Sequence, residues 1–263
     1  MLQYDSYRAV FEGMNAHLWT QNSGRMLWMT QPAWPSNHWQ IYNWDYDAAA
    51  PYYGVMKASE PVHVQLNLPD YQLAVTNTTL EPLSGLTLRA RVLTLDNRVL
   101  LDRSDPISVG ADAMVRGAKL DLAAAMAKGP VLVKLELTDA GGKLLSGNFY
   151  WEAAQASDLT QLDALPAAPI GLTLADGGVV DGERTINATL INHGVAAALE
   201  TKLTLLNPDG TRILPALYAD NYVSLLPGET RSVSIRFPAS ASHGQPQLAL
   251  RGWNVTPITV TLP

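Results

Sequence analysis

Alternation of apolar and polar residues dominates the chain after Pro61. Runs in which every second residue is apolar are typical of strands that bury one face. The first group of such runs comprises residues 62–67, 71–77, 85–96, 98–104, 115–122, 131–139 and 144–153. Seven short strands over about ninety residues predict an immunoglobulin-like β-sandwich. Residues 139–143, DAGGK, are expected to join its last two strands as a hairpin, and Trp151 is expected in its core.

A second group of alternating runs follows residues 155–169, which lack periodicity, contain Pro166 and Pro169, and are interpreted as a linker. The runs are 170–176, 183–192, 199–207, 211–217, 222–226, 230–237, 246–253 and 257–262. The two groups resemble each other: residues 75–77 correspond to 190–192, and residues 107–109 to 223–225. The offset of about 110 to 116 residues is the size of one sandwich domain, so the pattern predicts a duplicated fold.

The first sixty residues have a different pattern. Residues 5–19 predict a helix, in which apolar residues recur at intervals of three and four: Tyr7, Val10, Phe11, Met14 and Leu18. Residues 25–30, RMLWMT, are short and apolar, as is a strand buried on both faces in a parallel sheet. A long aromatic loop over 31–47 and a second helix over 48–59 follow. Helix, strand, loop and helix are one unit of an α/β barrel, whose other strands this chain lacks.

The predicted fold class is therefore mainly β, with two immunoglobulin-like sandwiches preceded by a terminal α/β fragment of a (β/α)8 barrel. The expected boundaries are 1–60 for the barrel fragment, 61–154 for the first sandwich, 155–169 for the linker and 170–263 for the second sandwich.

Composition narrows the class of protein. Charged residues are 16% and apolar residues 47% of the 263 residues, which supports large buried cores. The net charge of -6 is spread along the chain without a basic patch, which argues against a nucleic-acid partner. No apolar run is long enough to predict a membrane helix, and residues 1–11 lack the features of a signal peptide. The absence of cysteine excludes disulfides and thiolate metal sites but leaves the compartment undetermined.

Candidate catalytic chemistry is sparse. Hydrolysis of a glycosidic bond usually needs two carboxyl groups held across a cleft. Asp45 and Asp47 come late in the aromatic loop, Glu12 lies in a predicted helix, and Glu60 lies where the β-region begins, so no pair is predicted. The histidines are scattered without the spacing of a metal site, and no phosphate-binding loop is present, so neither metal nor cofactor is expected.

Aromatic residues concentrate near the N-terminus: five of the seven tryptophans lie between Trp19 and Trp44. Such rings either fill a core or line a site for the flat faces of sugars. Trp34 precedes Pro35 and is thereby biased to an extended conformation, which suits the wall of a pocket. The alternative is packing, which is the expected role of Trp28, Trp39 and Trp44 between barrel and sandwich.

The run WMTQPAWPSNHW (28–39), followed by PYYGVMKASEPVH (51–63), resembles the end of the catalytic barrel in glycoside hydrolase family 2. The likeness is greatest to exo-β-D-glucosaminidases and then to β-mannosidases, and it continues through FYW (149–151), NYVSLLPGET (221–230) and RGWN (251–254). The resemblance implies the C-terminal part of a larger enzyme, with both catalytic glutamates upstream of Tyr4. It also implies that Trp34 lines the subsite for the terminal sugar, with Trp39 and Asp45 at the pocket rim.

Three hypotheses follow. The chain is the accessory C-terminal region of a retaining exo-β-glycosidase that acts on oligosaccharides and is inactive alone. Alternatively, it is a non-catalytic carbohydrate-binding module that uses the tryptophan-rich loop, or a structural piece that self-associates through its exposed barrel fragment. The sugar specificity stays open, and for the parent enzyme the periplasm or secretion is one alternative.

Overall fold

The computed structural model describes residues 2–36 and 40–263 of the chain. By their contacts these residues form two compact units, called here the first and the second unit. The first unit holds residues 2–28 and 54–164, and the second holds residues 29–53 and 165–263. The first sixty residues are therefore divided between two units, and the division falls within helix α2 (Ala50–Ala58).

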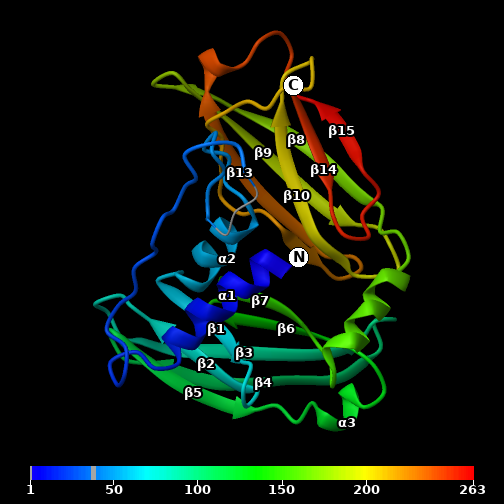
Figure 1. The fold of residues 1–263 in the computed structure, drawn as a ribbon. Helices are drawn as coiled ribbons and strands as arrows, with labels where there is room; N and C mark the ends of the chain where they lie inside the picture. Colours follow the sequence, from blue (N-terminus) through cyan, green and yellow to red (C-terminus); the bar gives the residue numbers. More distant parts are fainter. Residues whose placement is uncertain (1, 37–39) are drawn as a thin grey trace. The chain divides into compact units, whose positions relative to one another are not determined.

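Strands β1 to β7 form an antiparallel sandwich in the first unit (Figure 1). Their bounds, with the short helix α3, are β1 Val62–Asn67, β2 Gln72–Asn77, β3 Leu83–Thr94, β4 Val99–Val109, β5 Ala113–Lys119, α3 Ala123–Met126, β6 Val131–Thr138 and β7 Leu144–Glu152. One sheet has the order β1-β2-β5 and the other β4-β3-β6-β7. The predicted strands of this region are confirmed with small shifts of their ends, and the hairpin at residues 139–143 is confirmed by the hydrogen bond from the Asp139 N–H to the Lys143 carbonyl.

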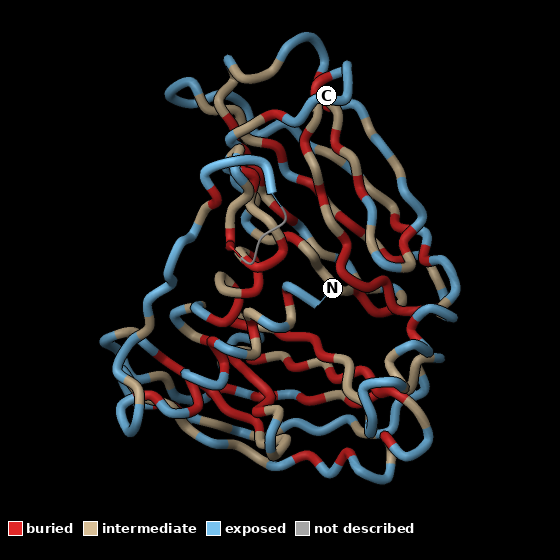
Figure 2. The backbone as a smooth tube through the Cα atoms, in the orientation of Figure 1, coloured by how far each residue is buried: buried red, intermediate tan, exposed pale blue. Residues whose placement is uncertain are grey.

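The core of this sandwich follows from the alternation. On β6, Val133, Leu135 and Leu137 are fully buried, whereas Lys134 and Glu136 between them are half-buried, so one face of each strand enters the core (Figure 2). The expectation for Trp151 is wrong, because this side chain is only half-buried. Its neighbour Tyr150 occupies the inward position on β7 and fills the core instead.

Strands β8 to β15 form the sandwich of the second unit (Figure 1). Their bounds are β8 Ile170–Val180, β9 Glu183–Asn192, β10 Ala198–Leu206, β11 Leu217–Tyr218, β12 Val223–Leu225, β13 Thr230–Pro238, β14 Gln247–Arg251 and β15 Ile258–Thr261. The sheets have the orders β11-β13-β9-β8 and β12-β10-β14-β15. The expected strand over 211–217 is largely absent, since only its last residue enters β11, and Pro215 has no N–H with which to join a ladder. Short 3₁₀ helices η1 (Ala156–Ala164) and η2 (Ala239–Ala241) complete the described elements.

The two sandwiches share one strand order. Sheet β1-β2-β5 has its counterpart in β8-β9-β13, and sheet β4-β3-β6-β7 in β12-β10-β14-β15. The predicted duplication of the fold is therefore confirmed.

The repeat extends to an asparagine corner in each sandwich. Asn77 ends β2, and its amide donates to the carbonyls of Glu81 and Gly110, both at 2.8 Å. Asn192 ends β9, and its amide donates to the carbonyls of Ala196 and Leu225, both at 2.9 Å. In each case the side-chain oxygen accepts the N–H two residues onward. Because both asparagines are buried, these bonds satisfy backbone groups that would otherwise lack a partner.

Helix α1 (Leu2–Asn15) lies in the first unit, and its buried face matches the predicted one only in part, at Phe11 and, beyond the helix, at Leu18. The buried residues are Tyr4, Arg8, Phe11, Glu12 and Asn15. Val10 and Met14, which the apolar spacing assigned to the interior, are exposed. The inward face carries two charged side chains because the strands opposite it supply polar partners, which hydrophobic periodicity does not detect.

Glu12 is the centre of this polar contact. One of its carboxylate oxygens accepts hydrogen bonds from Asn148 at 2.6 Å and from the Tyr150 hydroxyl at 2.9 Å. The same oxygen lies 3.0 Å from Nε2 of His63, whose Nδ1 is 3.2 Å from Glu60. Glu60 in turn accepts from Lys57 at 2.6 Å.

Both ring nitrogens of the fully buried His63 face carboxylate oxygens, so both must donate and the ring is an imidazolium. Burial by itself lowers the pKa of His63, but the hydrogen bonds to Glu12 and Glu60 outweigh it and raise the pKa. Burial raises the pKa of Glu60, but the bond to His63 and the charge of Lys57 lower it to about 2. Arg8 completes the cluster, since it pairs with Asp5 at 2.8 Å and donates to Asn148 at 3.0 Å. The three acids Asp5, Glu12 and Glu60 and the three cations Arg8, Lys57 and His63 thus form a largely buried charge network, and we call it the α1 anchor.

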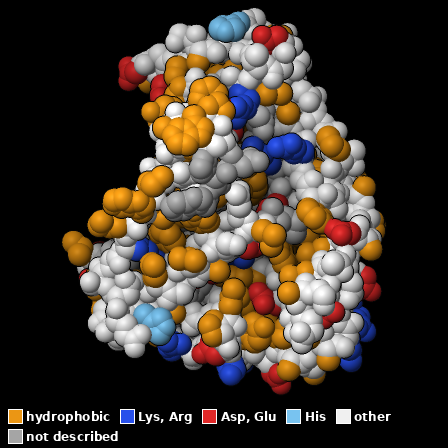
Figure 3. All heavy atoms as spheres, in the orientation of Figure 1, with side chains coloured by type: hydrophobic (Ala, Val, Ile, Leu, Met, Phe, Trp, Pro, Cys, Tyr) orange, Lys and Arg blue, Asp and Glu red, His pale blue; other side chains and the backbone are white. Residues whose placement is uncertain are grey.

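Residues 25–30 do not form the predicted buried strand. They have no regular secondary structure, and Met26, Trp28 and Met29 are exposed. A doubly buried strand needs a hydrogen-bonded neighbour on each side, and the described chain supplies neither. Figure 3 shows hydrophobic side chains open to solvent on the face it displays.

The α1 anchor predicts a pH-dependent stability. We expect His63→Gln to lower the free energy of unfolding by about 3 kcal/mol at pH 6, because it leaves the buried carboxylate of Glu12 without the cation bonded to it. The folded-state pKa of His63 lies above its ordinary value of 6.5, so the advantage of the wild type is full below that pH and is lost as the pH rises through the folded-state value. It stays intact down to about pH 4.5, where Glu60 begins to be protonated in the unfolded chain.

Urea denaturation between pH 5 and 9 measures this difference. His17→Gln is the matched control, because His17 is exposed at the end of the same helix. A difference between wild type and His63→Gln that does not change with pH would contradict an imidazolium at this position.

Candidate functional site

A polar concave region of the second unit lies around the loop of residues 41–49. Backbone bonds close this loop on itself: the Asn43 N–H donates to the Asp47 carbonyl at 2.9 Å, and the Ala49 N–H donates to the Ile41 carbonyl at 3.2 Å. Tyr46, with a φ of 65°, makes the tight bend between them. The loop therefore has a defined shape without belonging to a sheet.

Arg212 fixes the two aspartates of this loop. Its guanidinium donates to the Asp47 carboxylate at 2.8 Å and also to Asp45, so one planar fork spans both side chains. Arg212 follows the turn that ends β10, in which the Asn207 N–H donates to the Thr211 carbonyl at 2.8 Å. Asp47 is 8% exposed, so the arginine supplies the charge that its burial requires.

Aromatic stacking supports the same loop from within the second unit. The ring centroids of Tyr42 and Tyr52 are 5.2 Å apart, those of Tyr52 and Tyr53 are 5.1 Å apart, and those of Tyr53 and Tyr222 are 5.7 Å apart. Burial raises the pKa of Tyr53 and of Tyr222, so both hydroxyls stay neutral. The tyrosines of the N-terminal region are packing groups here.

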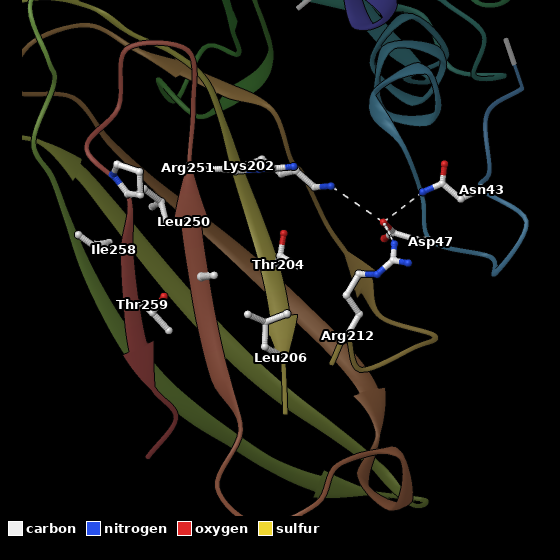
Figure 4. Close-up of a pocket in the computed structure, with 12 residues that line it drawn as sticks. Asn43, Asp47, Lys202, Thr204, Leu206, Arg212, Leu250, Arg251, Ile258 and Thr259 are labelled. Carbon is white, nitrogen blue, oxygen red and sulfur yellow. Dashed lines mark hydrogen bonds and ion pairs between the residues drawn. The ribbon is translucent and has the colours of Figure 1, made fainter. Parts of the chain in front are cut away.

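Two cavities adjoin the loop. The larger, of about 520 Å³, lies on the outward face of strands β10, β14 and β15, and we call it the sheet pocket (Figure 4). Figure 4 shows Asn43, Lys202 and Arg212 directed at Asp47, on one side of this pocket. The smaller cavity, of about 400 Å³, is called the loop pocket, and it is lined by Ser36, Asn43, Trp44, Asp45 and Arg212.

The predicted site residues have different surroundings. Trp34 is 64% exposed and contacts Ser36, whose hydroxyl donates to its carbonyl at 3.0 Å. Asp45 lines the loop pocket but is bound to Arg212, and Trp39 lies outside the described residues. Trp28 and Trp44, which were expected to pack between barrel and sandwich, are 78% and 49% exposed in this chain. Trp44 instead lies beside Asp45 in the loop pocket, a position that the sequence did not single out.

The sequence also gave no sign of the basic residues of this region. Arg212 and Lys202 lie more than 150 residues from the loop in sequence, and alternation only assigned Lys202 to an outward strand position. Arg212 and Lys202 lie next to Asp47 only because the second unit folds in this way.

The two pairs of carboxylates considered above, Glu12 with Glu60 and Asp45 with Asp47, do not suit glycoside hydrolysis. Glu12 and Glu60 approach the same histidine, but the low pKa of Glu60, about 2, leaves it without a proton to donate at neutral pH. Asp45 and Asp47 share Arg212. Among the described residues, no group of histidine, aspartate and glutamate side chains could hold a metal ion, and no helix is long and apolar enough to cross a membrane.

Comparison with known proteins relates both sandwiches to glycosidases. Residues 70–154 match the model of the mannosidase Ig/CBM-like domain, and residues 148–255 match that of the exo-β-D-glucosaminidase Ig-fold domain. The crystal structure of the exo-chitosanase of Amycolatopsis orientalis superposes on 98% of the chain with a TM-score of 0.92 and 29% identity. The chain is homologous to the C-terminal region of glycoside hydrolase family 2 enzymes. It covers 33% of that structure.

Relatives of known activity agree with this family 2 assignment. The exo-β-D-glucosaminidase of Streptomyces avermitilis is 29% identical over 99% of the chain and 32% of its own length. The mannosylglycoprotein endo-β-mannosidase of Lilium longiflorum is 30% identical over 97% of the chain and 33% of its own length. The chain thus spans about a third of the length of these family 2 relatives, which are glycosidases with immunoglobulin-like accessory domains.

Because Arg212 forms ion pairs with both aspartates of the loop of residues 41–49, we expect the structure of this loop to depend on Arg212. We expect Arg212→Gln to lower the free energy of unfolding by about 1–2 kcal/mol, because it leaves Asp47 buried without its main counter-charge while the arginine itself is partly exposed. Limited proteolysis should also cut within residues 41–49 faster than in the wild type.

Arg236→Gln is the matched control, since Arg236 is on the same sandwich and forms an exposed pair with Glu183 at 3.5 Å. We expect it to change the free energy of unfolding by less than about 0.5 kcal/mol. Equal effects of the two substitutions would show that Arg212 does not anchor the loop.

Proposed function

We propose that the chain is the C-terminal accessory region of a retaining exo-β-glycosidase, with residues 1–60 contributing the end of its catalytic barrel. In the parent enzyme it supports the barrel, and the reaction is hydrolysis of a terminal β-linked glucosamine or mannose. The observation that carries the proposal is the match to the exo-chitosanase of Amycolatopsis orientalis over 98% of the chain at a TM-score of 0.92.

The proposed parent reaction is a double displacement through a glycosyl-enzyme, which requires a nucleophilic carboxylate and a carboxylic acid about 5 Å from it. Elsewhere in the parent, residues outside this chain would supply both groups. The four acids described above are held by ion pairs, Asp45 and Asp47 with Arg212, and Glu12 and Glu60 with His63. These acids serve to hold structure together.

The exposed apolar residues support an accessory role. Met26 is 93% exposed and Trp28 is 78% exposed, and apolar side chains of this size are usually covered by a partner surface. In the proposed parent that surface is the rest of the barrel. On its own, the chain would use the same residues for self-association.

The accessory role predicts that the purified chain hydrolyses neither p-nitrophenyl β-D-glucosaminide nor p-nitrophenyl β-D-mannoside. Release of p-nitrophenol, followed by absorbance at high enzyme concentration, measures this. Turnover that a single Asp→Asn or Glu→Gln substitution within the chain abolishes would overturn the proposal.

A second candidate is a carbohydrate-binding module that uses the aromatic loop. The observation in its favour is that Trp34 and Trp44 present exposed rings from one unit, as a sugar-stacking surface requires. In the parent, Trp34 would line the terminal-sugar subsite, with Trp39 and Asp45 near its rim.

Calorimetric titration with chitosan oligosaccharides and manno-oligosaccharides separates the two candidates. Under the accessory role alone we expect no heat of binding. Heat that is lost in Trp34→Ala but kept in Trp253→Ala, whose side chain is 50% exposed in the same unit, would favour the module instead.

A further inference from the structure

The sheet pocket contains two like charges placed opposite each other. Lys202 on β10 and Arg251 on β14 are direct partners in the register of these strands. Like charges opposite each other on one face of a sheet repel, and a pair of this kind destabilises the sheet unless a counter-ion is present. Figure 4 shows both side chains extended to the same side of the pocket.

The acids nearby compensate this charge incompletely. Asp47 is 4.0 Å from the ammonium of Lys202, which is beyond hydrogen-bond distance, and both Asp45 and Asp47 are already bound by Arg212. Within residues 2–36 and 40–263, the Arg251 guanidinium forms no ion pair. Among the residues that line the pocket, the three cations Lys202, Arg212 and Arg251 therefore outnumber the one carboxylate, Asp47.

Desolvation strengthens the repulsion that Lys202 experiences from the neighbouring cations. The Lys202 side chain is only 16% exposed. Burial lowers the pKa of Lys202, Asp47 partly restores it, and Arg251 and Arg212 lower it further. A positive group held in this way gains more from an added anion than a solvated lysine does.

Next to the charges, the sheet offers a hollow lined by hydroxyl groups. Thr204, Ala249 and Thr259 are register partners across β10, β14 and β15, two residues along from the Lys202–Arg251 pair. The alanine between two threonines leaves space above the middle strand, and all three residues line the pocket of about 520 Å³. A monosaccharide fits a cavity of this size, and the two hydroxyls suit a polyhydroxylated ligand.

We propose that the sheet pocket binds an acidic sugar, with the carboxylate of a uronate held between Lys202 and Arg251 and its hydroxyls facing Thr204 and Thr259. The bound carboxylate neutralises the uncompensated charge and relieves the repulsion across the strands. The inference goes beyond the accessory role, because glucosamine is itself a cation at neutral pH and this pocket repels it. The site then selects a ligand unlike the parent's proposed substrate.

The test is calorimetric titration of the full chain with D-glucuronate at low ionic strength, where D-glucose, D-glucosamine and sodium acetate serve as comparison ligands. We expect glucuronate to bind at least tenfold more tightly than the other three. Arg251→Gln should weaken glucuronate binding roughly tenfold, since it removes a bidentate partner of the carboxylate. Arg236→Gln, an exposed arginine on the other sheet of the same sandwich, should leave it unchanged.

A thermal melt without ligand gives the second readout. Because Arg251→Gln removes the repulsion with Lys202, its midpoint should equal or exceed that of the wild type. The proposal is overturned by absence of glucuronate binding, by equal loss in the two variants, or by a lower midpoint of unliganded Arg251→Gln. Acetate that binds as tightly as glucuronate overturns the sugar assignment and identifies a simple oxyanion site.

Discussion

A buried carboxylate needs a partner, and this constraint organises the first unit around Glu12. The side chain is 3% exposed, and its partners come from distant parts of the chain: His63 from β1, and Asn148 and Tyr150 from β7. Burying the charge alone would cost several kcal/mol, so the helix can lie on the sandwich only when all of these groups are in place. Glu60 and Lys57 extend the compensation to helix α2. The network thereby determines which face of α1 is inward and where it contacts the strands.

The requirement that a buried carboxylate has a partner also holds in the second unit, but there the balance of acidic and basic side chains is different. Asp47 is buried and is held by Arg212 from the turn after β10, so the loop of residues 41–49 has a fixed shape on its sandwich. There the cations exceed the acids, whereas in the α1 anchor they alternate. A network in which every charged group has an oppositely charged partner stabilises the fold. A network with an unpaired positive charge is suited to binding an anionic ligand.

The sequence predicted the sandwiches well because the residue pattern of each strand can be recognised without knowledge of the rest of the fold. Alternation records which side of a strand is buried, and repetition of the pattern predicted that the fold is duplicated. For residues 5–30 the helix and the burial of Phe11 and Leu18 were predicted correctly, but two other predictions failed for physical reasons. The inward face of α1 is polar, so the apolar spacing of Val10 and Met14 indicated the wrong side of the helix. The run RMLWMT is apolar enough for a buried strand, but strand formation depends on neighbours that local composition cannot report. Trp44 and Lys202 entered the candidate site only through contacts that join distant segments.

The asparagine corners have a consequence for how the two sandwiches can diverge. Each corner spans four residues, Thr78 to Glu81 in one sandwich and His193 to Ala196 in the other, and the two share no residue type. Apart from the bond that the Thr79 hydroxyl donates to Asn77, the asparagine bonds involve main-chain atoms, so they restrict the side chains of these positions little. Gly194 is the exception, because a Cβ there would meet the Asn192 side-chain oxygen at 3.0 Å. An insertion or deletion would move the acceptor carbonyl out of reach. Such a corner tolerates extensive sequence drift while its length is held constant.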